Sequence, residues 1–497
     1  MSEHRSLPAI PRSALVAAAA VATLVLPPSA AIPLLLLVLA TRAALLAGKR
    51  LRARSTASTL TASAASDANA PDAITIGHNP AGQRVVVREQ DLRAHGLILG
   101  ASGSGKSTTM LTLLSAEIER GRPVVAIDLK GSPAFVDSLR QAAAAANRPF
   151  SVWSPDGPTH WNPLAAGNPT ELKDKLIATE RFTEPHYQRA AERYVQTALQ
   201  VLAAQSPQQP PSLAQVVELL EPQRLAAAAR ALPQERADQL RSYLHGMTPD
   251  QNSAVRGLGS RLAILTESHT GEYLEPGPNA VDLRRALDSD EVVVFSLNSS
   301  TYGRLAAQLG TLAVQDLITA TGARQSAASA DEDPSLALVA IDEFSALDSS
   351  NVINLLARGR EAGVGVLLAT QELADLDRAA RGLRDQVIGN TKVKIAHRQD
   401  VPESAATVAR LAGTYKQWER SYTIEPDPLG GAVRRVTNRL VDTFRAPPET
   451  VRSQRTGEAI VIRSGSGEAQ LTKISRQQRA VGRCSPVSEQ RHIPPER

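Results

Sequence analysis

Cysteine and aromatic residues are scarce in this 497-residue sequence. The single cysteine, Cys484, excludes a disulfide within the chain and leaves no cysteine-based zinc site. Aromatic residues make up only 3% of the chain, so alanine, leucine and valine must fill the core of the two or three domains that this length allows. A large charge excess is also missing, and the net charge of +5 permits a polyanionic or membrane-surface partner without requiring one.

Charged residues are absent from positions 13 to 41, which form two apolar arms separated by Pro27-Pro28. A single helix through both prolines would lose backbone hydrogen bonds that lipid cannot replace, which favours two short transmembrane helices at about 13–26 and 30–41. Basic residues on both sides indicate that both flanks face the cytoplasm, so residues 1–54 are predicted to anchor the chain in the inner or plasma membrane. One kinked span and a cleaved signal peptide are the alternatives.

After the predicted anchor, the composition divides the chain into further segments. Residues 55–72 are small and polar, as in a flexible linker, and residues 466–497 are typical of a disordered basic tail. Short apolar runs predict buried strands at 74–78, 84–88, 96–99, 123–128, 150–153, 291–297, 336–342, 364–370, 393–398 and 458–463. Because helical segments separate most of these runs, the sequence predicts an α/β fold with a mostly parallel sheet over residues 73–168 and 288–465. Residues 169–287 have amphipathic helical patterns and are predicted to form an inserted all-α domain.

The stretch "HGLILGASGSGKSTTM", residues 95–110, has the order strand, glycine-rich loop and helix start, and from Gly100 to Ser107 it fits the Walker A pattern G-x-x-x-x-G-K-[ST]. Glycines in such a loop let successive backbone N–H groups point at phosphate oxygens, at the positive end of the next helix. Lys106 would reach the terminal phosphates of ATP and the Ser107 hydroxyl would bind Mg²⁺, whereas a chance Gly/Ser turn is the alternative. The predicted nucleotide-binding residues are Gly100, Ala101, Ser102, Gly103, Ser104, Gly105, Lys106, Ser107 and Thr108.

Acidic and polar residues follow two later apolar strands. In "LALVAIDEFSAL" the strand ends in Asp342-Glu343, as in a Walker B element, where Asp342 would hold Mg²⁺ through water and Glu343 would orient or deprotonate the attacking water. In "VGVLLATQE" the strand ends in Thr370-Gln371, and Gln371 could sense the terminal phosphate. Without a Walker A motif, acids after a strand are common as helix caps, and Gln371 could equally be an ordinary strand end.

Two groups of basic residues have both a functional and an ordinary interpretation. Arg358 and Arg360 in "LLARGREAGVG" either offset a helix dipole or provide an arginine finger to a neighbouring subunit. Lys392, Lys394 and Arg398 are candidates for contacts with DNA phosphates in a pore, although solvated strand charges are the alternative.

These motifs together resemble those of the type IV secretion coupling proteins, the TraG/TraD-like conjugation ATPases of the HerA/FtsK P-loop group. The resemblance covers roughly residues 10–465 and includes "VVAIDLKGS", "HWNPL", "AIDEFSAL", "ARGREAGVGVLLATQELADL", "GNTKVKIAHR" and "GEAIVI". It implies a RecA-like ATPase core that uses ATP and Mg²⁺, forms a homo-hexameric ring, and drives single-stranded DNA with its relaxase into a secretion channel.

Residue by residue, the resemblance gives the catalytic roles to Lys106, Glu343, Gln371 and, as a finger in trans, Arg360. It also matches Asp128 and Lys130 to a D-x-K-G element without a defined role. The short, alanine-rich membrane arms and the absence of a long acidic tail depart from the family pattern.

Other functions remain open at this stage. An FtsK-like translocase of double-stranded DNA and a pump for protein substrates would use the same motifs. A receptor that docks the substrate and uses ATP as a switch with little turnover is a different class, but a switch would not need the catalytic acid Glu343. An ABC transporter ATPase is disfavoured because no LSGGQ-type signature lies between the Walker elements.

Overall fold

The computed structural model describes residues 70–475 apart from 181, 183, 328–333, 348 and 427–431. The predicted membrane arms, nearly all of the predicted linker and the last part of the predicted tail lie outside these residues. Within the described part of the chain, no helix combines the length and the hydrophobicity that a membrane span requires.

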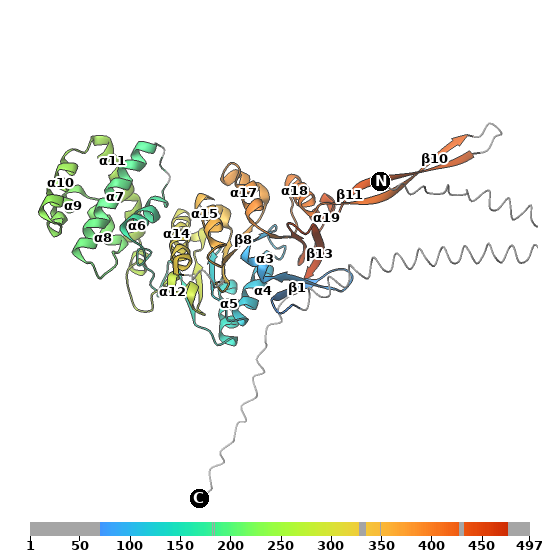
Figure 1. Cartoon of the computed structure of the whole chain (residues 1–497), viewed down its shortest axis with the longest axis horizontal. Helices are drawn as coiled ribbons and strands as arrows, with labels where there is room; N and C mark the ends of the chain where they lie inside the picture. The colour runs from blue at the N-terminus through green and yellow to red at the C-terminus, as the bar shows by residue number, and fades with distance from the viewer. Residues whose placement is uncertain are drawn as a thin grey trace, which may run out of the picture. The chain divides into compact units, whose positions relative to one another are not determined.

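One eleven-stranded sheet organises the described chain, in the order β2-β1-β13-β12-β9-β3-β8-β7-β4-β6-β5. Figure 1 labels three of these strands, β1, β8 and β13, among the helices that surround the sheet. Its strands are β1 (Ala73–His78), β2 (Arg84–Arg88), β3 (Gly96–Leu99), β4 (Val124–Asp128), β5 (Phe150–Trp153), β6 (Val292–Ser296), β7 (Ala337–Asp342), β8 (Val364–Thr370), β9 (Val393–Ala396), β12 (Glu458–Arg463) and β13 (Glu468–Ile474). From β9 to β5 every neighbouring pair is parallel, whereas β12, β13, β1 and β2 add an antiparallel edge. The predicted α/β fold with a largely parallel sheet is therefore confirmed.

Helices cover both faces of the parallel part. Ile98 of β3 packs in one core cluster with α4 (Lys106–Glu119) and α5 (Pro133–Ala145), while Leu97 and Leu99 pack in the other with α14 (Arg304–Ala327) and α15 (Ser349–Gly359). Because both faces of the sheet are buried, these strands are almost entirely apolar. This explains why short apolar runs in the sequence predicted their positions. The remaining α-helices around the sheet are α3 (Glu89–Arg93), α13 (Ser299–Tyr302), α16 (Leu373–Ala379), α17 (Leu383–Asn390), α18 (Pro402–Ala412) and α19 (Pro448–Arg452).

The described segment between β5 and β6 is helical. Its α-helices are α6 (Pro169–Ile177), α7 (Pro185–Gln205), α8 (Leu213–Leu219), α9 (Pro222–Ala228), α10 (Gln234–His245), α11 (Pro249–Thr266) and α12 (Leu283–Asp288). A buried ion pair attaches α6 to α14, since Lys175 Nζ lies 2.7 Å from Asp316 Oδ1 and the Lys175 side chain is 1% exposed. Trp161 Nε1 donates to the other oxygen of Asp316 at 3.1 Å, so the carboxylate has a partner on each side.

Two features of the C-terminal part differ from the sequence prediction. The predicted tail begins too early, because residues 468–474 form β13, which pairs with both β12 and β1. Its mixed sequence, EAQLTKI, is stabilised by these distant partners, which local composition does not reveal. The structure also contains a separate antiparallel hairpin that the sequence did not predict, formed by β10 (Thr414–Pro426) and β11 (Ala432–Phe444).

Candidate nucleotide-binding site

The Walker A loop connects the buried strand β3 to α4. Gly103 has φ of 73° and Gly105, the residue before α4, has φ of 114°, which are conformations that favour glycine. Gly100 is needed for a different reason, since a Cβ atom there would lie 2.4 Å from Ser104 Oγ and 2.8 Å from His397 Cβ. The loop is therefore tight, and it ends at the N-terminus of a 14-residue helix, where backbone N–H groups bind anions.

Four of the predicted catalytic and metal-binding side chains meet beside this loop. Lys106 Nζ lies 2.6 Å from Glu343 Oε1 and 3.5 Å from Asp342 Oδ1. Gln371 Nε2 donates to the same Glu343 oxygen at 3.2 Å. These residues come together because β3, β7 and β8 are parallel neighbours, so their carboxyl ends lie at one edge of the sheet.

The backbone at Glu343 is strained. Its φ of 58° is in the left-handed region, which is uncommon for residues other than glycine, asparagine and aspartate. Such conformations have a cost of about 1–3 kcal/mol and cluster at functional sites. Here the conformation turns the chain directly after β7 and places the Glu343 carboxylate against Lys106.

Lys130, which the sequence left without a role, is a second cation at this acid pair. Its Nζ lies 2.8 Å from Glu343 Oε1 and 3.2 Å from Asp342 Oδ2. Asp128, at the end of β4, accepts hydrogen bonds from the backbone N–H groups of Lys130 and Ser132 at 2.9 and 2.7 Å. Because β4 is the parallel neighbour of β7, this turn brings Lys130 to the Walker B acids.

The charges of this cluster set its protonation. Burial lowers the pKa of Lys106, although Asp342 and Glu343 oppose this effect. Burial would raise the pKa of Glu343, but the two lysines outweigh it and hold that pKa below its usual value. Burial also opposes the charged form of Lys130, yet the acids beside it raise its pKa overall. Glu343 is therefore ionised at neutral pH.

The residues present fit a nucleotide with Mg²⁺. The Ser104 hydroxyl is buried inside the loop without a hydrogen-bond partner, and Ser107 is partly exposed in the first turn of α4. Across the described part of the chain, no group of three or more His, Cys, Asp and Glu side chains could hold a metal by itself. This is compatible with Mg²⁺, which usually takes one or two protein oxygens together with phosphates and water. Ser107 and Asp342 are suitable as these ligands.

Comparison with known families decides what kind of protein carries this site. A family model described as the type IV secretion-system coupling protein DNA-binding domain matches residues 74–424, which is more than half of the 497-residue chain. The chain belongs to this family of coupling proteins. Comparison with curated proteins gives no match.

Solved structures with a similar fold include two of one conjugative coupling protein. TrwBdeltaN70 in its unbound monoclinic form is 16% identical, with a TM-score of 0.61, and the match covers 84% of this chain and 91% of that chain. The plasmid coupling protein TrwB in complex with ADP and Mg²⁺ is 16% identical, with a TM-score of 0.59 and coverage of 84% and 92%. VirB4 of Thermoanaerobacter pseudethanolicus is 15% identical, with a TM-score of 0.55 and coverage of 82% and 97%.

His397, which sequence reasoning missed, supports the Walker A loop of this coupling protein from behind. Its Nδ1 donates to the Glu458 carbonyl at 2.8 Å, so its Nε2 must accept the hydrogen bond from Thr109 Oγ1 at 2.9 Å. Burial lowers the pKa of His397 to about 4, and the ring is neutral at physiological pH. The only signal in the sequence was a histidine directly after a buried strand, and this pattern alone does not distinguish a core residue from a site residue.

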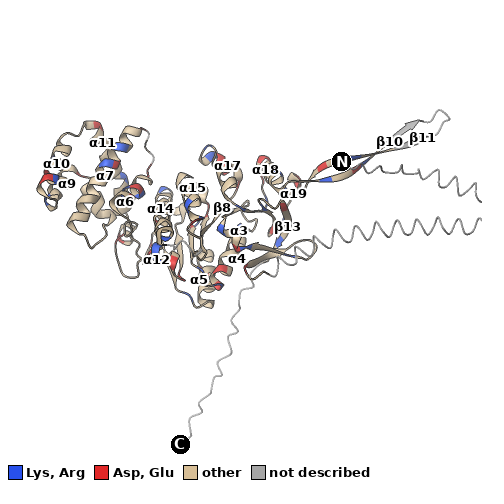
Figure 2. Cartoon of the chain, in the orientation of Figure 1, with Lys and Arg blue, Asp and Glu red and all other residues tan. Residues whose placement is uncertain are grey.

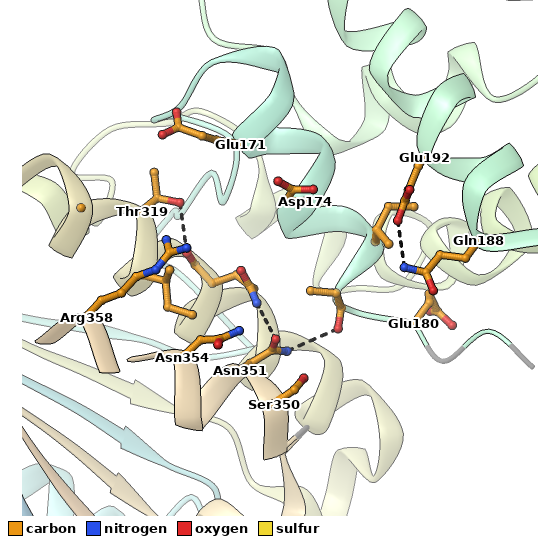
Figure 3. A pocket seen from close by; sticks show the side chains of 15 residues that line it. Glu171, Asp174, Glu180, Gln188, Glu192, Thr319, Ser350, Asn351, Asn354 and Arg358 are labelled. Atoms are coloured by element: carbon orange, nitrogen blue, oxygen red, sulfur yellow. Dashed lines mark hydrogen bonds between the residues drawn. The ribbon is translucent and has the colours of Figure 1, made fainter. Parts of the chain in front are cut away.

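The two arginines at the end of α15 occupy different surroundings. Arg360 is exposed and lies just before β8, whereas the Walker A loop lies beyond the other end of that strand. Seven strand residues span roughly 20 Å, so Arg360 is remote from Lys106 within one chain. Arg358 instead lines a pocket with Glu171, Asp174 and other residues of α6, α7, α14 and α15 (Figure 3). That pocket contains none of the predicted nucleotide-binding residues.

One of the three DNA candidates is wrong. Lys394 is only 2% exposed, and its Nζ donates to the Thr391 carbonyl and to Ser464 Oγ. Because the side chain is buried, its pKa is lowered to about 8. Its strand is buried on both faces, and a charge there cannot face a pore. Lys392 and Arg398 are partly exposed and pair with Asp91 at 3.6 Å and Asp400 at 3.0 Å. Figure 2 shows basic and acidic residues scattered together over the described helices.

Proposed function

We propose that this coupling protein is a membrane-anchored ATPase that hydrolyses ATP between subunits of a homo-hexameric ring and drives single-stranded DNA, with its relaxase, into a type IV secretion channel. The family membership supports the coupling of DNA to secretion. The observation that carries the enzymatic part is the convergence of Lys106, Glu343 and Gln371 at one oxygen, Glu343 Oε1, which both side-chain nitrogens contact. TrwB, a similar fold, was solved with ADP and Mg²⁺, and this supports the same cofactors here.

The chain's own residues have defined tasks in this proposal. The backbone N–H groups of Gly100–Thr108 and the Lys106 ammonium bind phosphate oxygens, and Ser107 with Asp342 holds Mg²⁺. When bound, ATP would supply the phosphoanhydride bond to be cleaved, and Mg²⁺ would neutralise charge on its phosphates. Glu343, ionised at neutral pH, accepts a proton from the attacking water, and Gln371 orients this carboxylate through its hydrogen bond. Lys130 keeps Glu343 ionised from the other side.

Arg360 is proposed to act in trans. Arg360 is exposed and lies before the amino end of β8, whereas the Walker A loop of the same chain lies at the carboxyl end of the neighbouring strand β3. Only the Arg360 of a second copy could therefore reach the phosphates. Arginine fingers of this kind increase turnover by roughly 10³–10⁵. The proposed anchor is residues 1–54, with spans at 13–26 and 30–41 in the inner or plasma membrane, and it keeps the ATPase domain in the cytoplasm.

Subunit mixing tests this function directly. The full chain would be assayed for steady-state ATP hydrolysis with and without single-stranded DNA, as wild type, Lys106→Ala, Glu343→Gln and Arg360→Ala. We expect DNA to stimulate the wild type and each variant to be inactive alone. An equimolar mixture of Lys106→Ala and Arg360→Ala should regain activity, because some interfaces then combine an intact loop with an intact finger. Arg358→Ala is the matched control and should retain activity.

Three results would contradict parts of the proposal. A mixture that stays inactive would exclude a finger in trans. Stimulation by double-stranded DNA alone would favour the FtsK-like alternative. DNA transfer that survives Glu343→Gln but not Lys106→Ala would indicate a docking receptor that uses ATP as a switch.

A further inference from the structure

The β10–β11 hairpin carries most of the exposed apolar side chains of the described chain. Among the side chains that the structure describes, eight large hydrophobic residues are exposed, and six of them belong to this hairpin. They are Tyr415, Trp418, Tyr422, Val436, Leu440 and Phe444, with exposures from 37% for Phe444 to 66% for Trp418. The other two, Ile264 and Leu471, lie in α11 and β13, so no second large apolar surface among the described residues matches the hairpin.

The strand register places five of these six residues on one face. Trp418 is opposite Leu440, Tyr422 is opposite Val436, and Phe444 is opposite Thr414. Directly opposed residues share a face and side chains alternate along a strand, so Trp418, Tyr422, Val436, Leu440 and Phe444 point to the same side. We call this set the apolar face. The other side carries polar residues such as Glu419 opposite Arg439 and Ser421 opposite Thr437.

An isolated two-stranded ribbon is marginally stable in water, so an apolar face of this kind needs a cover. We propose that the apolar face docks onto the interface between headgroups and acyl chains of the bilayer that holds the anchor. This inference rests on the membrane anchorage proposed above. Tryptophan and tyrosine are enriched at such interfaces because their rings are apolar with one polar atom. Lys416 and Arg420 lie on the same side of the ribbon, where long cations can reach anionic headgroups.

Chain lengths make this contact possible. The predicted linker, residues 55–72, has a root-mean-square reach of roughly 25 Å if it is flexible. Each hairpin strand has 13 residues and is about 40 Å long. If the anchor and linker are as predicted, the start of β1 would lie closer to the bilayer than the length of one hairpin strand.

The pairing of residues favours lipid over single-stranded DNA. Leu440 and Val436 lie directly opposite Trp418 and Tyr422, so each ring has an aliphatic neighbour across the strands. A single-stranded DNA platform stacks successive bases on aromatic faces, and aliphatic side chains beside both rings instead extend the apolar surface that a bilayer interface covers.

Tryptophan fluorescence offers a specific test. The chain has three tryptophans, and Trp153 and Trp161 are 0% exposed, so Trp418 alone can meet lipid. The full chain would be reconstituted into phosphatidylcholine–phosphatidylglycerol vesicles with and without brominated phosphatidylcholine, and the Trp418→Phe variant would supply the background. We expect brominated lipid to quench the Trp418 component and Leu440→Asp to abolish that quenching. Thr437→Asp, which is exposed on the polar side of the same strand, should retain it.

Other occupants would give different results, and each would overturn the inference. Trp418 that is untouched by brominated lipid but quenched by single-stranded DNA would indicate a nucleic-acid contact. If neither DNA nor brominated lipid quenches Trp418, and its emission maximum shifts with protein concentration, the apolar face contacts a second copy of the chain. A chain that does not float with the vesicles would instead refute the proposed anchor. ATP hydrolysis by Leu440→Asp in detergent should equal that of the wild type, because the hairpin lies outside the nucleotide site.

Discussion

Acid pH should destabilise this protein through two buried histidines, and His397 behind the Walker A loop is the more informative. Burial lowers its pKa from 6.5 to about 4, and it does the same for His95, whose Nε2 donates to the Leu356 carbonyl at 2.8 Å. The folded state thus favours the neutral ring more strongly than the unfolded state does. The stabilisation is complete above pH 6.5 and is lost as the pH falls toward 4, because the unfolded chain binds the proton first.

The magnitude follows from the shift. One pKa unit corresponds to about 1.36 kcal/mol, so a shift from 6.5 to about 4 corresponds to about 3 kcal/mol for each histidine. At pH 5 about 2 kcal/mol of this is already lost, since the unfolded ring is then almost fully protonated and the folded ring is not. Solvent does not screen these rings, because His397 is 0% and His95 is 2% exposed.

The assay compares free energies of unfolding in urea at pH 7 and pH 5 for matched variants. Glutamine keeps a donor and an acceptor but does not titrate, so His397→Gln should lose about 2 kcal/mol less than the wild type between the two pH values. Buried carboxyls with a raised pKa, such as Glu117 and Asp128, act in the opposite direction but are common to all variants.

Equal pH dependence in the wild type, His397→Gln and the double variant with His95→Gln would refute this reasoning. It would mean that the rings are protonated in the folded state as easily as in the unfolded state. A pH-independent loss in His397→Gln alone would instead measure the packing of the ring between β9 and α4.

Two further predictions concern the ion pairs. Lys175→Met should lower the free energy of unfolding by about 3–5 kcal/mol, because it removes the cation beside the buried Asp316 carboxylate. Adding Asp316→Leu should recover part of this loss in urea denaturation, but not all of it, because Trp161 Nε1 then loses its acceptor. No recovery would indicate that lost packing, not the unpaired carboxylate, causes the effect. Lys130→Met should raise the pKa of Glu343, so the fall of the ATP hydrolysis rate at acid pH should begin at a higher pH. Lys130→Arg keeps the positive charge and should leave this pH dependence unchanged. A rate that decreases by the same factor at every pH in Lys130→Met would contradict this role of Lys130.

The sequence predicted the parts of the site that depend on local chemistry. The Walker A loop was predictable because its glycines and Lys106 are required within eight consecutive residues. The Walker B acids and Gln371 were predictable because each ends an apolar run, and parallel strands bring such ends together. Lys130 received no role because its contact depends on β4 lying beside β7, and one sequence does not give the order of strands in space.

Other features escaped prediction because they depend on distant contacts. Lys394 lies within β9 and His397 directly follows it, and both side chains are buried. Their partners are far away in the sequence, since Lys394 Nζ donates to Ser464 Oγ and His397 bonds Thr109 Oγ1 and the Glu458 carbonyl. The β10–β11 hairpin was missed because its apolar residues face outward among charges and form no continuous run. An exposed apolar face gives a weak pattern in sequence, although in structure it is a strong indication of a binding surface.

The strand order also connects the Walker A loop to the segments that the proposal places near the membrane. The turn before β12 contacts the loop directly, with Gly457 N donating to the Ser104 carbonyl at 2.8 Å and Thr456 Oγ1 donating to the Gly103 carbonyl at 3.2 Å. β12 pairs with β13, and β13 pairs with β1, the first strand after the predicted linker. The β10–β11 hairpin enters the same region, since only α19 separates β11 from this turn. A force on the linker or the hairpin would thus reach the phosphate-binding loop through paired strands and one short helix, without passing through the inserted helices.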